Sequence, residues 1–274
     1  MLTIPAKIML IGEIAVVRGG KAVVMPLAKK FELLSKKNSK LDIHKDSPAG
    51  QLLKKYNFDP QNLKFNDPFD AQGGFGRSTA EYLALQQMID PTKTIFEIWQ
   101  EYRSFWGGLR STPSGADLVC QGLNEAVVVD PSSREIEKID LTWIRNQILV
   151  FSATHQEQRK TKTHVFLESI SERKIERLNE LKEKVDLFLK GNSEKDISLV
   201  SQAINEFAEI CENEHLEVIA AKEDREAILE LDGVLAVKGC GANLSDSLIV
   251  LIKKTAIQKY LISEIEKRNL KYVV

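Results

Sequence analysis

A glycine-rich turn that runs directly into a helical pattern, in residues 73–85, constrains the fold more than any other stretch of the sequence. Its three glycines leave the backbone free to adopt positive φ angles and to lie close to a ligand. Ser78 and Glu81 have the spacing of a capping box, which predicts a helix N-terminus at Ser78. The free N–H groups and the dipole of such an N-terminus attract anions, a nucleotide phosphate best of all. An ordinary loop followed by a capped helix explains the same residues, so both interpretations stay open.

The composition limits the kinds of molecule that the protein is expected to bind. The chain has 274 residues, enough for one large domain or two modest ones, and its net charge of -1 does not favour nucleic acid or an anionic membrane. The longest apolar runs are too short to span a bilayer, and residues 1–7 lack the layout of a signal peptide. Three widely spaced cysteines are typical of reduced thiols. We therefore expect a cytoplasmic protein that acts on a small molecule, as a monomer or a homodimer.

Short apolar runs and one helical pattern organise the first half of the chain. Residues 7–11 and 22–25 are apolar runs on either side of a Gly-Gly turn, which predicts two strands joined by a tight turn. Further along, Thr94 and Glu97 have capping-box spacing at the start of a helical apolar face. The aromatic residues of that face favour a packed core over a stacking platform.

The composition changes near residue 145. Residues 148–151 predict a strand, and a long helical region with charged faces, typical of solvated surface, follows. Two further short apolar runs flank another loop of small residues near the C-terminus. We therefore divide the chain into an N-terminal α/β half, residues 1–145, and a C-terminal α+β half, residues 146–274.

Three loops of small residues, each beside the end of a strand or helix, are placed to converge on one polyphosphate. Each loop alone is weak evidence for a phosphate site. The order of the loops and the charged residues next to them make the pattern more specific. Lys7 and Glu13 precede the first loop, Asp117 ends the second, and Lys238 opens the third. The three loops are residues 73–79, 107–117 and 238–245.

Four segments resemble the motifs of the GHMP kinases, the superfamily of galactokinase, homoserine kinase, mevalonate kinase and phosphomevalonate kinase. Residues 5–17 resemble the family's opening strand and its Gly-Glu-His/Tyr-Ala-Val segment. Residues 74–80 are similar to the phosphate loop Gly-Leu-Gly-Ser-Ser-Ala-Ala. Residues 113–117 resemble the segment that carries the catalytic aspartate, and residues 238–246 resemble the third glycine motif, in the form found in phosphomevalonate kinases.

The resemblance implies a fold and a cofactor. The fold is α+β, the two-lobed GHMP kinase fold, with an N-terminal ribosomal S5-like lobe (residues 1–145) that holds the phosphate loop. The C-terminal lobe (residues 146–274) is ferredoxin-like. The implied activity is ATP-dependent phosphoryl transfer with Mg²⁺, in which positioning and charge stabilisation do most of the catalytic work.

The resemblance also implies roles for individual residues. Asp117 would orient or deprotonate the acceptor, and Lys7 would pair with Asp117. Ser78 would bind both nucleotide and Mg²⁺. The nucleotide-binding set is Gly73, Gly74, Gly76, Arg77, Ser78, Thr79, Gly239 and Gly241, and the acceptor-binding set is Glu13, Arg18, Ser114, Gly115 and Lys160.

Each of these residues has a structural alternative. Asp117 is equally a candidate helix N-cap, and Lys7 a strand-edge lysine whose ammonium reaches solvent. Arg77 binds a phosphate bidentately or is simply exposed. Arg18 and Lys160 are acceptor-binding cations or surface charges. The residue types alone do not decide between these roles.

The acceptor expected first is phosphomevalonate, and mevalonate is the second choice. The third motif supports the first choice, as does the absence at Ile14 of the histidine that mevalonate kinases have there. A catalytically impaired metabolite-binding protein on the same scaffold is the alternative outside the enzymes. It is favoured by residues 242–245, which stand where the family has successive glycines.

Overall fold

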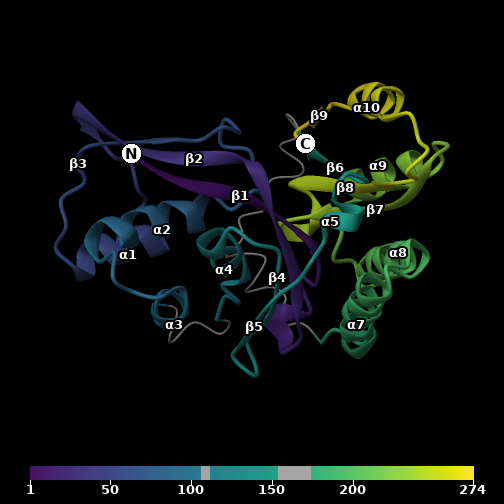
Figure 1. Cartoon of the computed structure of the whole chain (residues 1–274), viewed down its shortest axis with the longest axis horizontal. Helices are drawn as coiled ribbons and strands as arrows, with labels where there is room; N and C mark the ends of the chain where they lie inside the picture. Colours follow the sequence, from purple (N-terminus) through teal and green to yellow (C-terminus); the bar gives the residue numbers. More distant parts are fainter. Residues whose placement is uncertain (106–111, 154–173) are drawn as a thin grey trace.

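The computed structural model describes residues 1–105, 112–153 and 174–274, whose strands form two antiparallel sheets (Figure 1). In Figure 1 the helices of the first hundred residues lie to the left and the C-terminal sheet lies to the right, with α4 near the centre. The long N-terminal strands reach from the left into the middle of the molecule.

The first sheet is built around one long strand, β2 (Ala22–Lys40), which pairs with three neighbours. β1 (Leu2–Ile11) runs antiparallel along much of it. β3 (Gln61–Asn66) pairs with its C-terminal half and β4 (Val127–Asp130) with its first residues, and β5 (Glu135–Lys138) pairs with β4. The strand predicted at 22–25 is therefore only the beginning of a much longer one.

Two layers of helices pack on this sheet, and a 3₁₀ turn, η1 (Val16–Arg18), follows β1. α2 and α4 lie against β1 and β2, while α1 packs on α2 and α3 packs on α4. The predicted capping box at the start of α3 is confirmed, because the Thr94 and Glu97 side chains each bond the other's backbone N–H. The helices are α1 (Pro48–Lys55), α2 (Arg77–Ile89), α3 (Ile95–Ser104) and α4 (Ala116–Leu123).

The start of α2 differs from the expected capping box. Gly76, with φ 84°, is the N-cap, and no side chain in the part of the chain that the structure describes caps the helix. Ser78 lies inside the first turn, so its assignment as a cap is wrong. Glu81 instead accepts a hydrogen bond from Arg77 Nε at 2.9 Å, since residues four apart face each other on a helix. The first N–H groups of α2 are therefore left without a capping side chain.

The second sheet has the strand order β7-β8-β6-β9, all antiparallel. Its strands are β6 (Ile148–Ala153), β7 (Val234–Cys240), β8 (Ser247–Ile252) and β9 (Leu270–Tyr272). The helices around it are α5 (Thr142–Arg145), α7 (Leu178–Glu194), α8 (Ile197–Asn213), α9 (Ile219–Leu229) and α10 (Gln258–Glu266), with a 3₁₀ turn, η3 (Ala242–Leu244), between β7 and β8. Among the residues described, no helix combines the length and apolar character needed to cross a bilayer.

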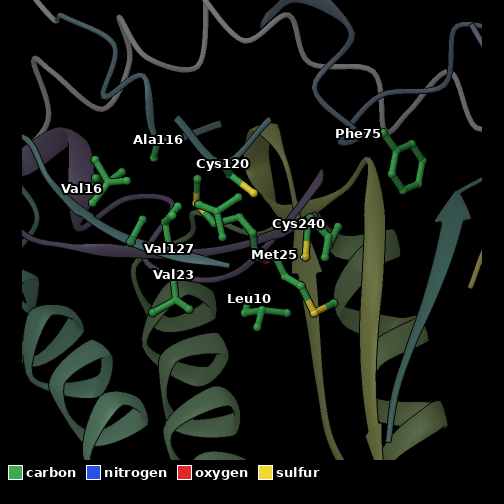
Figure 2. Close-up of a cluster of buried hydrophobic side chains, with 14 of the residues drawn as sticks. Leu10, Val16, Val23, Met25, Phe75, Ala116, Cys120, Val127 and Cys240 are labelled. Carbon is green, nitrogen blue, oxygen red and sulfur yellow. Dashed lines mark hydrogen bonds between the residues drawn. The ribbon is translucent and has the colours of Figure 1, made fainter. Parts of the chain in front are cut away.

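The side chains of the second sheet divide between two cores because successive residues of a strand face opposite ways. On β8, Leu248 and Val250 join a smaller core with α9 and α10, whereas Ile249 and Leu251 join the main core. That main core also contains the buried residues of the first sheet. Figure 2 shows Met25 of β2 together with Cys240 of β7. The strands thus form separate sheets, while one hydrophobic core spans both.

Candidate functional site

The glycine loop lies directly on β1. The Lys7 N–H donates to the Phe75 carbonyl at 3.2 Å, which joins the loop to the strand through the backbone. The Phe75 ring is buried and stacks on Phe69, with ring centroids 4.1 Å apart. A Cβ atom added to Gly76 would lie 3.0 Å from Lys7 Cγ, and Gly76 also has a positive φ. Glycine is therefore required at this point for both conformation and space.

Lys7 and Asp117 form the ion pair that the resemblance implied. Lys7 Nζ lies 2.8 Å from Asp117 Oδ2, and the lysine side chain is 6% exposed against 29% for the aspartate. Asp117 Oδ1 is buried and has no hydrogen-bond partner among the described residues. The N-cap of α4 is Gly115, so the alternative in which Asp117 caps the helix is wrong. One carboxylate oxygen is thus held by the lysine, and the other makes no hydrogen bond to a described residue.

An aromatic side chain of α3 fixes the loop in front of Asp117. Trp99 is fully buried, and its Nε1 donates to the Ser114 carbonyl at 2.7 Å. A Cβ atom on Gly115 would lie 2.5 Å from Trp99 Cδ1, and Gly115 has a φ of 69°. Ser114 and Gly115, which were expected to bind the acceptor, therefore have a structural role against the indole ring.

Replacing Trp99 with phenylalanine tests that role. The variant keeps an aromatic ring but leaves the Ser114 carbonyl without its donor, so we expect the free energy of unfolding to fall by about 2 kcal/mol. Urea denaturation of both proteins measures the difference. Tyr260→Phe is the matched control, since it also removes the polar group of an aromatic side chain, and Tyr260 is on α10 and 51% exposed. Its effect should stay within about 0.5 kcal/mol. Equal losses in the two variants would contradict the role of the Ser114 bond.

Gln121 holds three parts of the site together. This fully enclosed side chain of α4 donates from Nε2 to the Pro5 carbonyl at 2.8 Å and to the Gly76 carbonyl at 3.2 Å. Its Oε1 accepts from the Thr79 hydroxyl, which also contacts the Gly76 carbonyl at 2.9 Å. The Thr79 side chain, expected to bind nucleotide, is therefore engaged in fixing the glycine loop.

The third loop presses against the glycine loop. A Cβ atom on Gly73 would lie 2.7 Å from Asp246 Cγ, and one on Gly74 would lie 2.5 Å from Ser247 Oγ. Gly241 also packs against the Asp246 carboxylate, whose Oδ2 accepts from the Ala242 N–H at 3.3 Å. Gly73 and Gly74 must be glycines because the Asp246 and Ser247 side chains fill the space that a Cβ atom would need.

Asp246 places an ionisable carboxyl group at the contact between the third loop and the glycine loop. Burial raises the pKa of Asp246 to about 6, against the opposing effects of the Ala242 N–H and the Lys7 charge. An aspartate in an unfolded chain has a pKa of about 3.9. Because the folded pKa is the higher one, ionisation of Asp246 destabilises the fold as the pH rises through this interval.

A second ion pair joins the two sheets. Lys238 of β7, fully buried, pairs with Glu13, which follows β1 and whose side chain is 7% exposed. Burial disfavours the ammonium, but Cys240 and the Glu13 carboxylate raise the pKa of Lys238. Lys238 Nζ also donates to the Gly239 carbonyl at 2.7 Å. Glu13 Oε2 is buried and has no partner among the described residues.

The remaining expected site residues are distributed more widely. Arg77 Nε donates to Glu81, and its guanidinium lies 3.4 Å from Asp67 Oδ2, with 42% of the side chain exposed. Ser78 is exposed in the first turn of α2. Arg18 ends η1 and is half-buried. Lys160 lies outside the described residues.

Sequence reasoning missed three side chains that shape this site. Trp99 belongs to the aromatic face for which the sequence predicts a packed core, and it is buried there, but its bond to Ser114 has no sequence signature. Gln121 stands out only as an amide within an apolar helix, a weak sign of a buried polar contact. Asp246 was noted as the end of the third motif without a partner.

Comparison with known proteins gives the class of fold. No family model matches the sequence, and no curated protein matches it by sequence. Among solved structures, mevalonate kinase from Methanococcus jannaschii matches with a TM-score of 0.73 at 14% identity, over 99% of this chain and 96% of that one. Streptococcus pneumoniae phosphomevalonate kinase in complex with phosphomevalonate and AMPPNP matches with a TM-score of 0.70 at 12% identity, over 100% and 98%.

Lactococcus lactis galactokinase complexed with galactose matches with a TM-score of 0.69 at 10% identity, over 97% of this chain and 89% of that one. All three neighbours are GHMP kinases, and each is covered over nearly its whole length. The chain therefore has the GHMP kinase fold, and the predicted two-lobed α+β architecture is confirmed.

Proposed function

We propose that the chain is an ATP-dependent kinase that uses Mg²⁺ and phosphorylates a small acidic alcohol, with phosphomevalonate as the first candidate. The observation that carries this proposal is the Lys7–Asp117 pair, at 2.8 Å, beside the glycine loop. One aspartate oxygen is held by the lysine while the other has no partner among the described residues. A group that orients an acceptor hydroxyl needs such a free oxygen on a fixed carboxylate.

The chain's residues fit a nucleotide phosphate. α2 begins after Gly76 with no capping side chain, so its first N–H groups and its dipole are directed toward any anion at the glycine loop. Gly76 has a positive φ, which turns the loop directly into the first turn of α2. These features support ATP binding at this loop.

The residues also fit Mg²⁺, which prefers oxygen ligands and is usually held by one or two protein groups plus phosphate oxygens. Ser78, an exposed residue in the first turn of α2, has the side chain that we assign to the cation. When bound, ATP would supply the phosphoryl group and Mg²⁺ would offset the charge of its phosphates.

The chain's own groups have distinct tasks in this proposal. Asp117 Oδ1 accepts a hydrogen bond from the acceptor hydroxyl and aligns it for attack. Lys7 keeps the carboxylate in place and adds a positive charge where negative charge develops. Glu13 contributes Oε2, the oxygen that Lys238 does not hold, to acceptor binding.

Phosphomevalonate is the preferred acceptor because the third loop has the length and terminal residues, Lys238 and Asp246, of the phosphomevalonate kinase motif. A solved neighbour, the Streptococcus pneumoniae enzyme, binds that compound together with AMPPNP. Arg18 and Lys160 are the cations proposed for its phosphate. A cytoplasmic location is part of the proposal, supported by three buried cysteines, all free thiols.

A panel assay tests the acceptor. With ATP and Mg²⁺, we expect phosphomevalonate to give the highest kcat/KM, about tenfold or more above mevalonate, because charge-assisted hydrogen bonds contribute about 1.5–3 kcal/mol each. Diphosphomevalonate, homoserine and galactose complete the panel. A preference for mevalonate would change the acceptor and keep the kinase, whereas no turnover of any acceptor would reject both.

A metabolite-binding protein without turnover is the second candidate. It is favoured by the third loop, where Leu244 adopts a φ of 54°, and by Gly239, which packs against the Leu244 carbonyl within the same loop. When residues of a loop pack against one another in this way, fewer of its backbone groups are accessible to a ligand. Tight ATP binding in calorimetry with no phosphoryl transfer to any of the panel would identify this case.

A further inference from the structure

We propose that Asp246 makes nucleotide binding at the glycine loop depend on a divalent cation, so that the site accepts metal-complexed ATP and rejects the metal-free anion. This inference rests on the proposed function, in which the glycine loop binds ATP. In this inference, Asp246 is the residue that distinguishes metal-complexed ATP from metal-free ATP, two forms that differ in charge.

The Asp246 carboxylate lies at the contact between the glycine loop and the third loop. Its Cγ is 2.7 Å from the position of a Cβ atom on Gly73, and its Oδ2 lies against Gly241. The Asp246 N–H donates to the Cys240 carbonyl at 3.0 Å, which fixes the residue at the end of the third loop. A negative charge therefore stands in contact with the loop that would receive the phosphates.

The charge of Asp246 is only partly compensated. Within the described residues no lysine or arginine forms an ion pair with it, and its Oδ2 accepts one long hydrogen bond, 3.3 Å, from the Ala242 N–H. Lys7, the cation whose field reaches Asp246, is already paired with Asp117. A partly buried carboxylate in this situation favours the arrival of a positive charge.

A second polar group at the same place lacks a partner. Ser247 is fully buried, and its Oγ makes no hydrogen bond among the described residues. That oxygen lies 2.5 Å from the position of a Cβ atom on Gly74. Buried polar atoms without partners are rare in folded proteins and often mark the place of an ion or ligand.

The electrostatics give the direction of the effect. Metal-free ATP would bring several negative charges beside the Asp246 carboxylate, in surroundings that screen charge less than water does. A divalent cation on the phosphates would reduce that repulsion, and the cation itself would attract the carboxylate. An asparagine at position 246 would neither repel the bare anion nor attract the metal complex.

Calorimetric titration with ATP, once in EDTA and once in excess Mg²⁺, tests the inference. For the wild type we expect the Kd to be more than about tenfold lower with Mg²⁺. For Asp246→Asn we expect metal-free ATP to bind about tenfold more tightly than to the wild type, and the effect of Mg²⁺ to shrink to about threefold or less. Asparagine has the same shape and keeps an oxygen for the Ala242 N–H, so this variant should fold.

Asp70→Asn is the matched control, since Asp70 is exposed, lies three residues before Gly73, and has a φ of 52° that asparagine also tolerates. Its ratio of the two Kd values should equal that of the wild type. An unchanged ratio in Asp246→Asn would overturn the inference while leaving the kinase proposal intact. Absence of ATP binding to the wild type under both conditions would overturn the proposed function, and the inference with it.

Discussion

Asp117→Asn should lower the turnover number by about 10²–10⁴-fold while leaving the Kd for ATP within about threefold of the wild type. The amide keeps the shape of the side chain, but it can neither take a proton nor carry the charge that Lys7 Nζ holds at 2.8 Å. In the proposed function the carboxylate acts on the acceptor hydroxyl, so the loss is expected in the chemical step and not in nucleotide binding. Steady-state kinetics with the preferred acceptor and calorimetry with ATP separate the two effects.

The control for this experiment is Asp90→Asn. Asp90 follows the last residue of α2, at the opposite end of that helix from the glycine loop, and its carboxylate contacts only Thr92 among the hydrogen bonds of the described residues. Its turnover should match the wild type. If Asp117→Asn retained more than about a tenth of wild-type turnover, Asp117 would not be the orienting group.

Lys238→Met should reduce the free energy of unfolding by about 3–5 kcal/mol, because the Glu13 carboxylate would stay buried without its cation. Both side chains of this pair are almost completely removed from solvent, 0% for the lysine and 7% for the glutamate. Water cannot replace the lost partner unless the structure opens between β1 and β7. Urea denaturation monitored by tryptophan fluorescence gives the difference directly.

The double variant Glu13→Gln/Lys238→Met identifies the cause. It removes the unpaired Glu13 charge, and we expect it to recover more than half of the stability lost in Lys238→Met. Replacing both partners of a buried ion pair by neutral residues often costs little stability. Lys184→Met breaks the partly exposed pair with Glu206 and should cost less than about 1 kcal/mol. A double variant no more stable than Lys238→Met alone would show that packing, and not the unpaired charge, causes the loss.

The sequence predicted the parts of the site whose signals are local. The glycine loop, the helix after it and the segment ending at Asp117 each follow from residue types a few positions apart. The contact between Lys7 and Asp117 came from the family resemblance, because residues 110 positions apart carry no spacing rule. The same reason hides the Glu13–Lys238 pair, which closes 225 positions of chain.

The misjudged elements have particular causes. The strand at 22–25 runs on to Lys40, since Phe31 and Leu33 are buried at the two-residue spacing of a strand, yet Pro26 and a run of lysines obscure that alternation. The cap of α2 was assigned to Ser78 because a serine followed by a glutamate three positions on satisfies the capping-box pattern. A glycine with a positive φ ended the loop two residues earlier.

The hydrophobic core that both sheets share limits how this molecule can open. Two lobes rotate freely about a hinge only when the surface between them is small or polar. Here Met25 and Cys240 belong to one packed interior, and the Glu13–Lys238 pair is buried across the same junction. Rotation of one lobe against the other as a rigid body would expose apolar side chains. It would also separate the Glu13 carboxylate from the Lys238 ammonium. Any ligand must therefore reach the site by local displacement of loops over a fixed frame. If the chain is the kinase proposed above, the rate of those displacements sets an upper bound on its turnover.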